Sequence, residues 1–175
     1  MGRWRVFCLQ CGQGLSERLL PSEDRPRLVC DQCGYIHYLN PRVVCGTLPV
    51  WDGQVWLLRR GIEPRRGYWS HPAGYLEVGE STADGALRET HEELRWAVQI
   101  VRLLGVYSRA AAPVVNVVYL AAPLEPTSRP QTTPEALEVL PFAPDAIPWD
   151  DMAFPSTAQA LRDWIAGLDA TKGLT

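Results

Sequence analysis

Alternating apolar and polar positions predict most of the strands in this chain. Residues 42–60, RVVCGTLPVWDGQVWLLRR, form two apolar runs around Asp52-Gly53, a two-residue turn sequence typical of a β-hairpin. Residues 99–108 and 114–121 have the same strand character and are separated at Pro113. Four prolines in 122–135 predict an exposed loop, and EALEVLPF, residues 135–142, is expected to return to the sheet.

Two segments have helical character. Ser81 and Asp84 have the spacing of a capping box, which predicts a helix that begins near Thr82. Ser156 is expected to cap a second helix that continues to about Leu168, with an apolar face made of Leu161, Trp164, Ile165 and Leu168. Strands first, one helix in the middle and one at the end favour an α+β fold or an α/β/α sandwich with a mixed sheet.

Composition narrows the class of protein. The chain has 175 residues, an apolar fraction of 46% and a formal net charge of -3, so nothing indicates a nucleic-acid or membrane surface. No stretch reaches the roughly 18 apolar residues that cross a bilayer, and the first residues contain no apolar run of signal-peptide length. We therefore expect a cytoplasmic protein, in which cysteines stay reduced and metal binding becomes more plausible than disulfides.

Four of the five cysteines form two pairs. Cys8 and Cys11 make one CxxC, Cys30 and Cys33 make another, and a glycine follows each pair. Eighteen residues separate the pairs, which is within the range of a structural four-cysteine zinc site. A redox CxxC and two accidental pairs are the alternatives. The remaining Cys45 is expected to be a small buried hydrophobe.

The predicted middle helix contains a cluster of acidic residues. Glu89, Glu92 and Glu93 have the i, i+3, i+4 spacing that places three carboxylates on one helix face. One interpretation is a solvated acidic face, stabilised in part by an Arg88–Glu92 pair. The other is a binding site for a hard cation such as Mg²⁺, which prefers oxygen ligands.

The residues that flank this cluster favour the cation. Gly74, Glu80 and the run Arg88-Glu89-x-x-Glu92-Glu93 have the spacing Gx5Ex7RExxEE, which resembles the Nudix box. Together with the cysteine pairs, residues 8 to about 96 resemble Nudix hydrolases that carry an N-terminal zinc ribbon. Three positions depart from the family pattern, all at sites of helix packing or termination: Thr90, Arg95 and Trp96.

The resemblance implies a fold, cofactors and residue roles. It implies a zinc ribbon in 1–38, a Nudix domain in 39–170 with an α/β/α sandwich, and a tail in 171–175. Catalytic Mg²⁺ or Mn²⁺ would be bound by Glu89, Glu92, Glu93 and the Ala73 carbonyl, and structural Zn²⁺ by the four cysteines. Arg88 would orient a glutamate, and Glu80 would be a ligand or an anchor. The general base would be Glu89, or a loop residue such as Glu135 or Glu138.

The resemblance also implies a substrate class. Relatives of this group cleave dinucleotide-type pyrophosphates such as ADP-ribose, FAD or NADH. NADH-directed members carry SQPWPFPxS after the box, and RLLGVYSRAAAPVVN stands here instead, so ADP-ribose or FAD is favoured. NADH, NAD-capped RNA and a non-catalytic nucleotide-binding module are the alternatives. Substrate contacts are expected from Arg60, Arg65, Trp69 and Glu135. A homodimer is compatible with the resemblance.

Overall fold

The structure, a computed structural model, describes residues 7–172 and divides into two compact units between Asn40 and Pro41. The first unit is a three-stranded antiparallel sheet made of β1 (Leu15–Arg18), β2 (Arg27–Cys30) and β3 (Ile36–His37). Gly12 and Gly34 have φ values of 73° and 75°, and each donates its N–H to the carbonyl of the first cysteine in its CxxC. Glycine adopts this left-handed conformation without a steric cost, so each CxxC closes as a tight turn.

The second unit contains one mixed sheet. The path runs β10-β5-β4-β9-β8, and β4 and β9 are parallel, whereas the other pairs are antiparallel. Its elements in chain order are β4 (Arg42–Trp51), β5 (Gln54–Arg60), β6 (Trp69–Ser70), β7 (Ala73–Tyr75), α1 (Thr82–Leu94), β8 (Val98–Ser108), β9 (Val114–Pro123), β10 (Ala136–Phe142), a 3₁₀ turn (Trp149–Asp151) and α2 (Pro155–Lys172). This architecture confirms the predicted sandwich with a mixed sheet.

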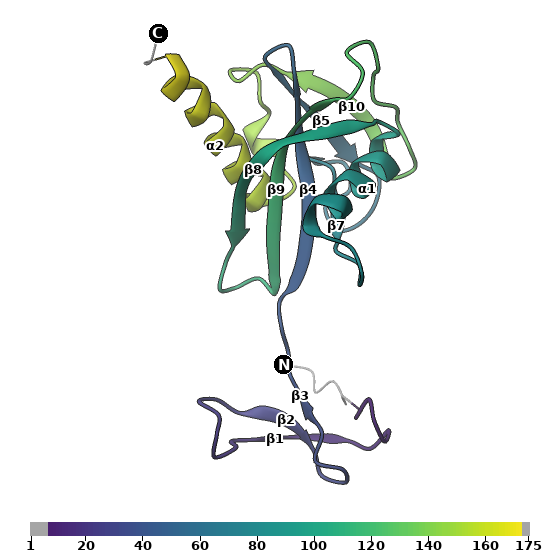
Figure 1. Cartoon of the computed structure of the whole chain (residues 1–175), viewed down its shortest axis with the longest axis vertical. Helices are drawn as coiled ribbons and strands as arrows, with labels where there is room; N and C mark the ends of the chain where they lie inside the picture. The colour runs from purple at the N-terminus through teal and green to yellow at the C-terminus, as the bar shows by residue number, and fades with distance from the viewer. Residues whose placement is uncertain (1–6, 173–175) are drawn as a thin grey trace. The chain divides into compact units, whose positions relative to one another are not determined.

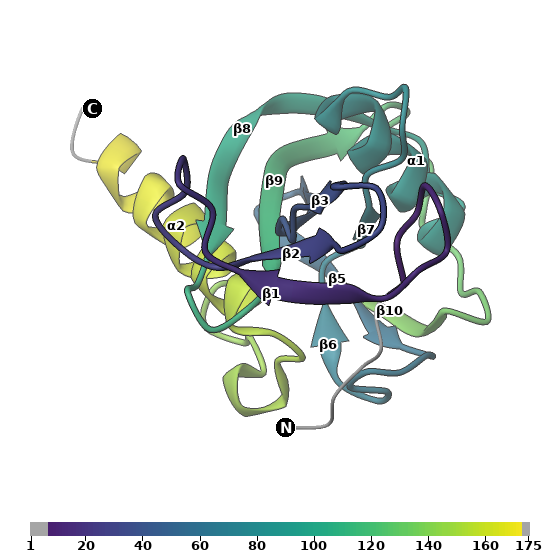
Figure 2. The same cartoon turned by 90° about the horizontal axis from the view of Figure 1, so that it is seen from below.

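The two helices cover opposite faces of this sheet (Figures 1 and 2). Consecutive residues of a strand point to opposite faces, so Leu57 packs in the α2 core and Leu58 in the α1 core. The α2 core comprises Leu48, Val55, Leu57, Trp69, Val118, Ile147, Ala160, Leu161 and Trp164, and the α1 core comprises Leu58, Leu94, Trp96, Val98, Ala121 and Ala136. Nearly all of these side chains are apolar, so burial of both sheet faces drives folding.

Strands β4 and β5 pair only beside their turn, which opens a gap in the sheet. Their register contains Val50 opposite Val55 and Trp51 opposite Gln54. Beyond this point β7 pairs with β4 and β6 pairs with β5, so these two short strands occupy the gap. The segment that leads into the acidic helix therefore begins inside the sheet.

The helix boundaries test two capping predictions. Ser81 caps α1 as expected, because its Oγ accepts a hydrogen bond from the Asp84 N–H at 3.1 Å. The prediction that Ser156 caps α2 is wrong, because α2 begins at Pro155 and Ser156 lies inside it. Proline suits the first helical position, where its fixed φ is helical and no N–H is needed.

The far end of α2 bears on the predicted tail. The helix continues to Lys172, two residues into the segment 171–175, and the rest of that segment lies outside the described residues. Within residues 7–172, no helix is long and apolar enough to span a membrane.

The three departures from the Nudix box are accommodated by local contacts. Buried Thr90 donates to the Ala86 carbonyl and bonds the Thr47 hydroxyl, each at 2.7 Å. Arg95 ends α1 in the left-handed conformation, with φ 50°, and its N–H bonds the His91 carbonyl. Trp96 is buried, stacks edge-on against Trp56 and donates its indole N–H to Ser128 at 2.9 Å. The helix therefore ends in an ordered cap.

Candidate active site and metal centre

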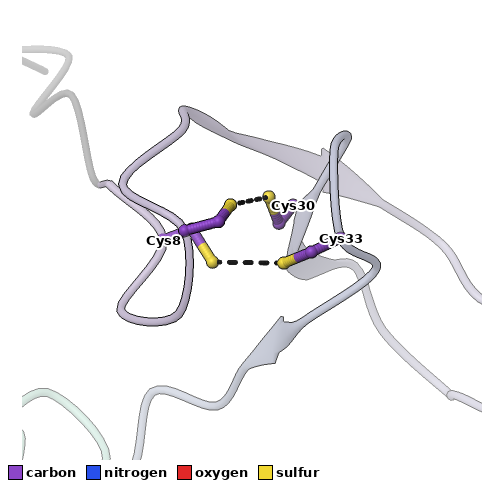
Figure 3. Close-up of side chains that lie close together, drawn as sticks. Cys8, Cys30 and Cys33 are labelled. Carbon is purple, nitrogen blue, oxygen red and sulfur yellow. Dashed lines mark hydrogen bonds between the residues drawn. The ribbon is translucent and has the colours of Figure 1, made fainter.

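The four paired cysteines converge in the first unit. The Sγ atoms of Cys8 and Cys33 are 3.5 Å apart and those of Cys11 and Cys30 are 3.4 Å apart (Figure 3). All four lie within 4.8 Å of one another, and in the described part of the chain they are the one such group of His, Cys, Asp or Glu. A tetrahedral site with Zn–S bonds of about 2.3 Å has sulfur separations of about 3.8 Å.

One of the four thiols ionises readily, whereas burial and hydrogen bonds between the sulfurs raise the pKa of Cys11 and Cys33. The backbone N–H of Cys33 hydrogen-bonds the Cys30 sulfur and lowers the pKa of that thiol to about 6. Metals bind the thiolate rather than the thiol. Cys45 is fully buried outside this group, and burial raises its pKa to about 11, so it has the expected character of a buried hydrophobe.

In the second unit, the acidic helix faces the segment that occupies the gap between β4 and β5. The Ala73 N–H donates to Oε2 of Glu93 at 2.9 Å. Gly74 stands against the Glu89 carboxylate, and a Cβ at this position would collide with its carboxylate atoms. A side chain at position 74 would therefore displace the Glu89 carboxylate from its place beside the backbone.

Both of these glutamates are shielded from water. Glu93 is 4% exposed, and burial raises its pKa to about 8. Burial also raises the pKa of Glu89, although Arg88 acts in the opposite direction. Buried carboxylates without enough counter-charge are costly, and a bound cation would relieve that cost.

Arg88 holds the remaining acidic residues of the box. Its guanidinium donates to both carboxylate oxygens of Glu80, at 2.7 and 3.0 Å, to Glu89 at 2.8 Å and to Glu92 at 3.0 Å. The bidentate pair lowers the pKa of Glu80 to about 2. Of these residues only Glu89 lines a cleft. Arg88 therefore joins Glu80, Glu89 and Glu92 in one hydrogen-bonded group, in which the Glu92 side chain is 54% exposed.

A cleft of about 1170 Å³ adjoins the two buried glutamates. Its acidic end contains Glu89, Glu93 and Glu135, together with Ala73 and Gly74. Glu135 lies close enough to raise the pKa of both Glu89 and Glu93. The other walls come from β8, β9, the loop after β8 and α2, and include Tyr107, Arg109, Asn116, Phe154, Gln159 and Arg162.

The structure separates the predicted substrate contacts into two groups. Arg60 lines the cleft, where its guanidinium lies 5.1 Å from the Phe154 ring centroid, and Glu135 lines it too. Trp69 instead packs in the α2 core against Phe142, and Arg65 lies over Tyr68 outside the cleft lining. The structure therefore argues against Trp69 and Arg65 as substrate contacts. Glu138 also lies outside the cleft, paired with Arg59 at 3.5 Å.

The α2 side of the cleft was not predicted from the sequence. Pro155, Gln159 and Arg162 share one helix face and line the cleft, and the apolar face of the same helix packs on the sheet. The polar pair Gln159 and Arg162, at i, i+3 spacing on this face, is the sequence signal. They are indistinguishable from an ordinary solvated face until the helix is placed in the fold.

His71 is buried at the base of the cleft and is uncharged at neutral pH. Burial lowers its pKa to about 4, and its Nδ1 lies 3.1 Å from the Thr157 hydroxyl. The Ser70 hydroxyl donates to the His71 carbonyl and also bonds Thr157. This group of hydrogen bonds joins the start of α2 to the segment that enters the box.

Sequence comparison assigns both units. The Nudix domain family matches residues 40–166, and the Nudix N-terminal zinc-ribbon family matches residues 6–39. A crystal structure of a Nudix hydrolase from Nitrosomonas europaea has a TM-score of 0.82 with this chain at 39% identity, covering 89% of this chain and 87% of that one. This chain belongs to the Nudix hydrolase family and carries the N-terminal zinc-ribbon module of that family.

Two curated relatives bear on the substrate. An ADP-ribose pyrophosphatase from Methanocaldococcus jannaschii is 29% identical over 105 residues, covering 59% of this chain and 58% of the relative. An NAD-capped RNA hydrolase, NudC, from Vibrio parahaemolyticus is 31% identical over 116 residues, covering 66% of this chain and 42% of the relative. The chain thus spans about half the length of the curated relatives it matches.

Proposed function

We propose that this protein is a divalent-metal-dependent hydrolase that cleaves the pyrophosphate linkage of a nucleoside diphosphate derivative, with ADP-ribose or FAD as the favoured substrate. The observation that carries the proposal is the pair Glu89 and Glu93, two shielded carboxylates held against Ala73–Gly74 at one end of a large cleft. The Nudix box supplies both glutamates and also Arg88, which donates a hydrogen bond to Glu89 and would orient it.

The donor set fits Mg²⁺ or Mn²⁺. Glu89 and Glu93 would hold the ion together with the Ala73 carbonyl, and all three residues line the cleft. Glu92, at the exposed edge, would contribute charge to the cluster. When bound, the ion supplies charge stabilisation for phosphoryl oxygens and acidifies water. In the first unit, the four thiols fit structural Zn²⁺.

The chain's own residues would divide the remaining work. Water attacks one phosphorus, the bond from that phosphorus to the bridging oxygen breaks, and a nucleoside monophosphate leaves. A carboxylate that accepts the water proton must line the cleft, which favours Glu89 or Glu135 over Glu138. The positive charge of Arg60 offsets part of the rise that burial causes in the pKa of Glu93, so Arg60 acts on the acidic end of the cleft. There its guanidinium would bind a phosphate.

A second substrate class has specific support. The similarity to NudC proteins favours NADH or NAD-capped RNA as the alternative, since both share the pyrophosphate linkage. The cleft is larger than the upper end of typical small-ligand pockets, about 1,000 Å³, which suits a dinucleotide of either kind. Cytoplasmic location and homodimerisation stay predictions from the sequence.

A substrate panel tests the proposal. Purified protein with Mg²⁺ is given ADP-ribose, FAD, NADH, NAD-capped RNA and diadenosine polyphosphates, and the products are separated by chromatography. We expect cleavage of ADP-ribose or FAD to a nucleoside monophosphate, and loss of activity when Mg²⁺ is omitted. Cleavage of NAD-capped RNA alone would select the alternative, and no cleavage of any member would contradict the proposal.

A further inference from the structure

Trp69, the aromatic residue predicted to contact the substrate, is buried away from the cleft. Trp69 is 8% exposed and belongs to the α2 core. A nucleotide in the cleft would still present a planar base, and bases stack on aromatic rings or on the guanidinium plane of arginine. The question is therefore which planar group the cleft offers at a suitable distance from the phosphates.

Three arginine–aromatic pairs have a member in the cleft. Two of them belong to its acidic end. Tyr75, under Arg42, follows Gly74, and Phe154 lies beside Arg60, whose charge acts on Glu93. The third pair is Arg162, whose guanidinium carbon lies 5.2 Å from the centroid of the Trp149 ring. Arg162 lines the cleft.

The position of Arg162 on α2 sets it apart from the phosphate end. Pro155 begins α2 directly after Phe154, which contacts Arg60. Seven residues later, Arg162 lies about 10 Å further along the helix axis, at 1.5 Å per residue. Arg162 therefore lies apart from the helix end that follows Phe154, as a base lies apart from its phosphate in a nucleotide.

Arg162 is also free to bind a ligand. Among the described residues, no carboxylate lies within ion-pair distance of it, and its guanidinium contacts the Trp149 ring. Trp149 is 37% exposed and lies in the 3₁₀ turn that precedes α2. The cation–π contact with Trp149 would restrict the motion of the guanidinium before a ligand arrives, which lowers the entropic cost of binding.

We propose that Arg162, held against the Trp149 ring by a cation–π contact, is the platform that binds the aromatic base of the nucleotide substrate. This proposal takes the ligand class, a nucleotide, from the proposed function. The chemistry is specific to a planar fork: a lysine at the same position would keep the charge but offer no plane on which a base could stack.

The test measures the binding of two monophosphates that differ in the base. AMP and ribose 5-phosphate share the phosphate and the sugar, and neither contains a P–O–P linkage, so neither is consumed. Calorimetric titration with Mg²⁺ compares the wild type with Arg162→Ala, Arg162→Lys and Trp149→Ala. The matched control is Arg109→Ala, because Arg109 lines the same cleft but makes no cation–π contact with any ring of residues 7–172.

The proposal predicts a base-dependent loss. Base stacking is worth enough that the wild type should bind AMP at least roughly fivefold more tightly than ribose 5-phosphate. All three substitutions at Arg162 and Trp149 should remove most of this preference and leave ribose 5-phosphate affinity nearly unchanged, while Arg109→Ala keeps the preference. Thermal unfolding of each variant confirms that it is folded.

Three results would overturn the proposal. These are equal affinity of the wild type for the two ligands, an AMP preference that persists in Arg162→Ala, and full retention of the preference in Arg162→Lys, which would indicate charge alone. The substrate panel is independent of this test. A protein that cleaves no member of the panel but shows the base-dependent loss would refute the hydrolase function and support the base site. A protein that cleaves a member of the panel but shows no base-dependent loss would support the hydrolase function and refute the base site.

Discussion

The hydroxyl pair between Thr47 and Thr90 allows a sharp test of how α1 is fixed to the sheet. Both side chains are fully buried, and their hydroxyl oxygens are 2.7 Å apart. The Thr90 proton is committed to the Ala86 carbonyl, so Thr47 must donate to Thr90. Thr90→Val keeps the shape of the side chain but leaves the Thr47 O–H buried without an acceptor.

The direction of these hydrogen bonds sets the expected magnitudes. A buried polar group that loses its partner costs about 1–3 kcal/mol, so Thr90→Val should lower the free energy of unfolding by this amount. Thr47→Val removes a donor while Thr90 keeps its bond to Ala86, and should cost about 1 kcal/mol or less. The double variant leaves no orphaned hydroxyl and should lie closer to wild type than Thr90→Val does. Threonine and valine have similar helix propensities, so a change in helix propensity at position 90 does not contribute to the measured difference.

The assay is urea unfolding at 25 °C, followed by tryptophan fluorescence and fitted for the midpoint and slope. The four proteins form a double-mutant cycle, and we expect a favourable coupling between the two substitutions. Equal costs for the two single variants, or strictly additive costs in the double variant, would show that Thr47 does not depend on Thr90 as its acceptor.

Three further predictions concern the metal sites. Gly74→Ala should reduce turnover at least about tenfold, because its Cβ would collide with the Glu89 carboxylate, and steady-state kinetics on a cleaved member of the panel measures this. Burial raises the pKa of Glu93 from an ordinary 4.5 to about 8 in the folded protein. Without added Mg²⁺, this shift contributes stability that is present below pH 4.5 and lost as pH rises through 8. Urea midpoints of the wild type should therefore fall over this pH range, and Glu93→Gln should flatten that fall. Cys30→Ser should lower the zinc content from about one per chain and destabilise the first unit, whereas Cys45→Ser should keep its zinc. Elemental analysis of the purified proteins measures the zinc. A folded wild type without zinc would contradict the zinc assignment.

Local patterns predicted the elements well. The capping residue of α1, the Asp52-Gly53 turn and the cysteine pairs each depend on residues a few positions apart, so the sequence carries their geometry directly. The spacing of the box glutamates likewise follows from the helical repeat.

Long-range packing decided what could not be predicted. Trp69 has a flat aromatic ring of the kind that stacks on nucleotide bases, but pairing of its short strand with β5 places it in the α2 core. Glu135 and Glu138 are three residues apart, and only the fold shows that Glu135, just before β10, lines the cleft, whereas Glu138, within β10, pairs with Arg59 outside it. Arg162 enters the site because α2 packs on the sheet, more than 60 residues after the box.

The most direct test of the central claim is the turnover of ADP-ribose or FAD by Glu93→Gln, with Glu138→Gln as the matched control. The same chemical change is made in a buried cleft carboxylate and in a half-exposed one that pairs with Arg59 outside the cleft. We expect Glu93→Gln to lose nearly all Mg²⁺-dependent cleavage while the protein stays folded, and Glu138→Gln to cleave close to the wild-type rate. Wild-type turnover by Glu93→Gln would contradict the assignment of this site.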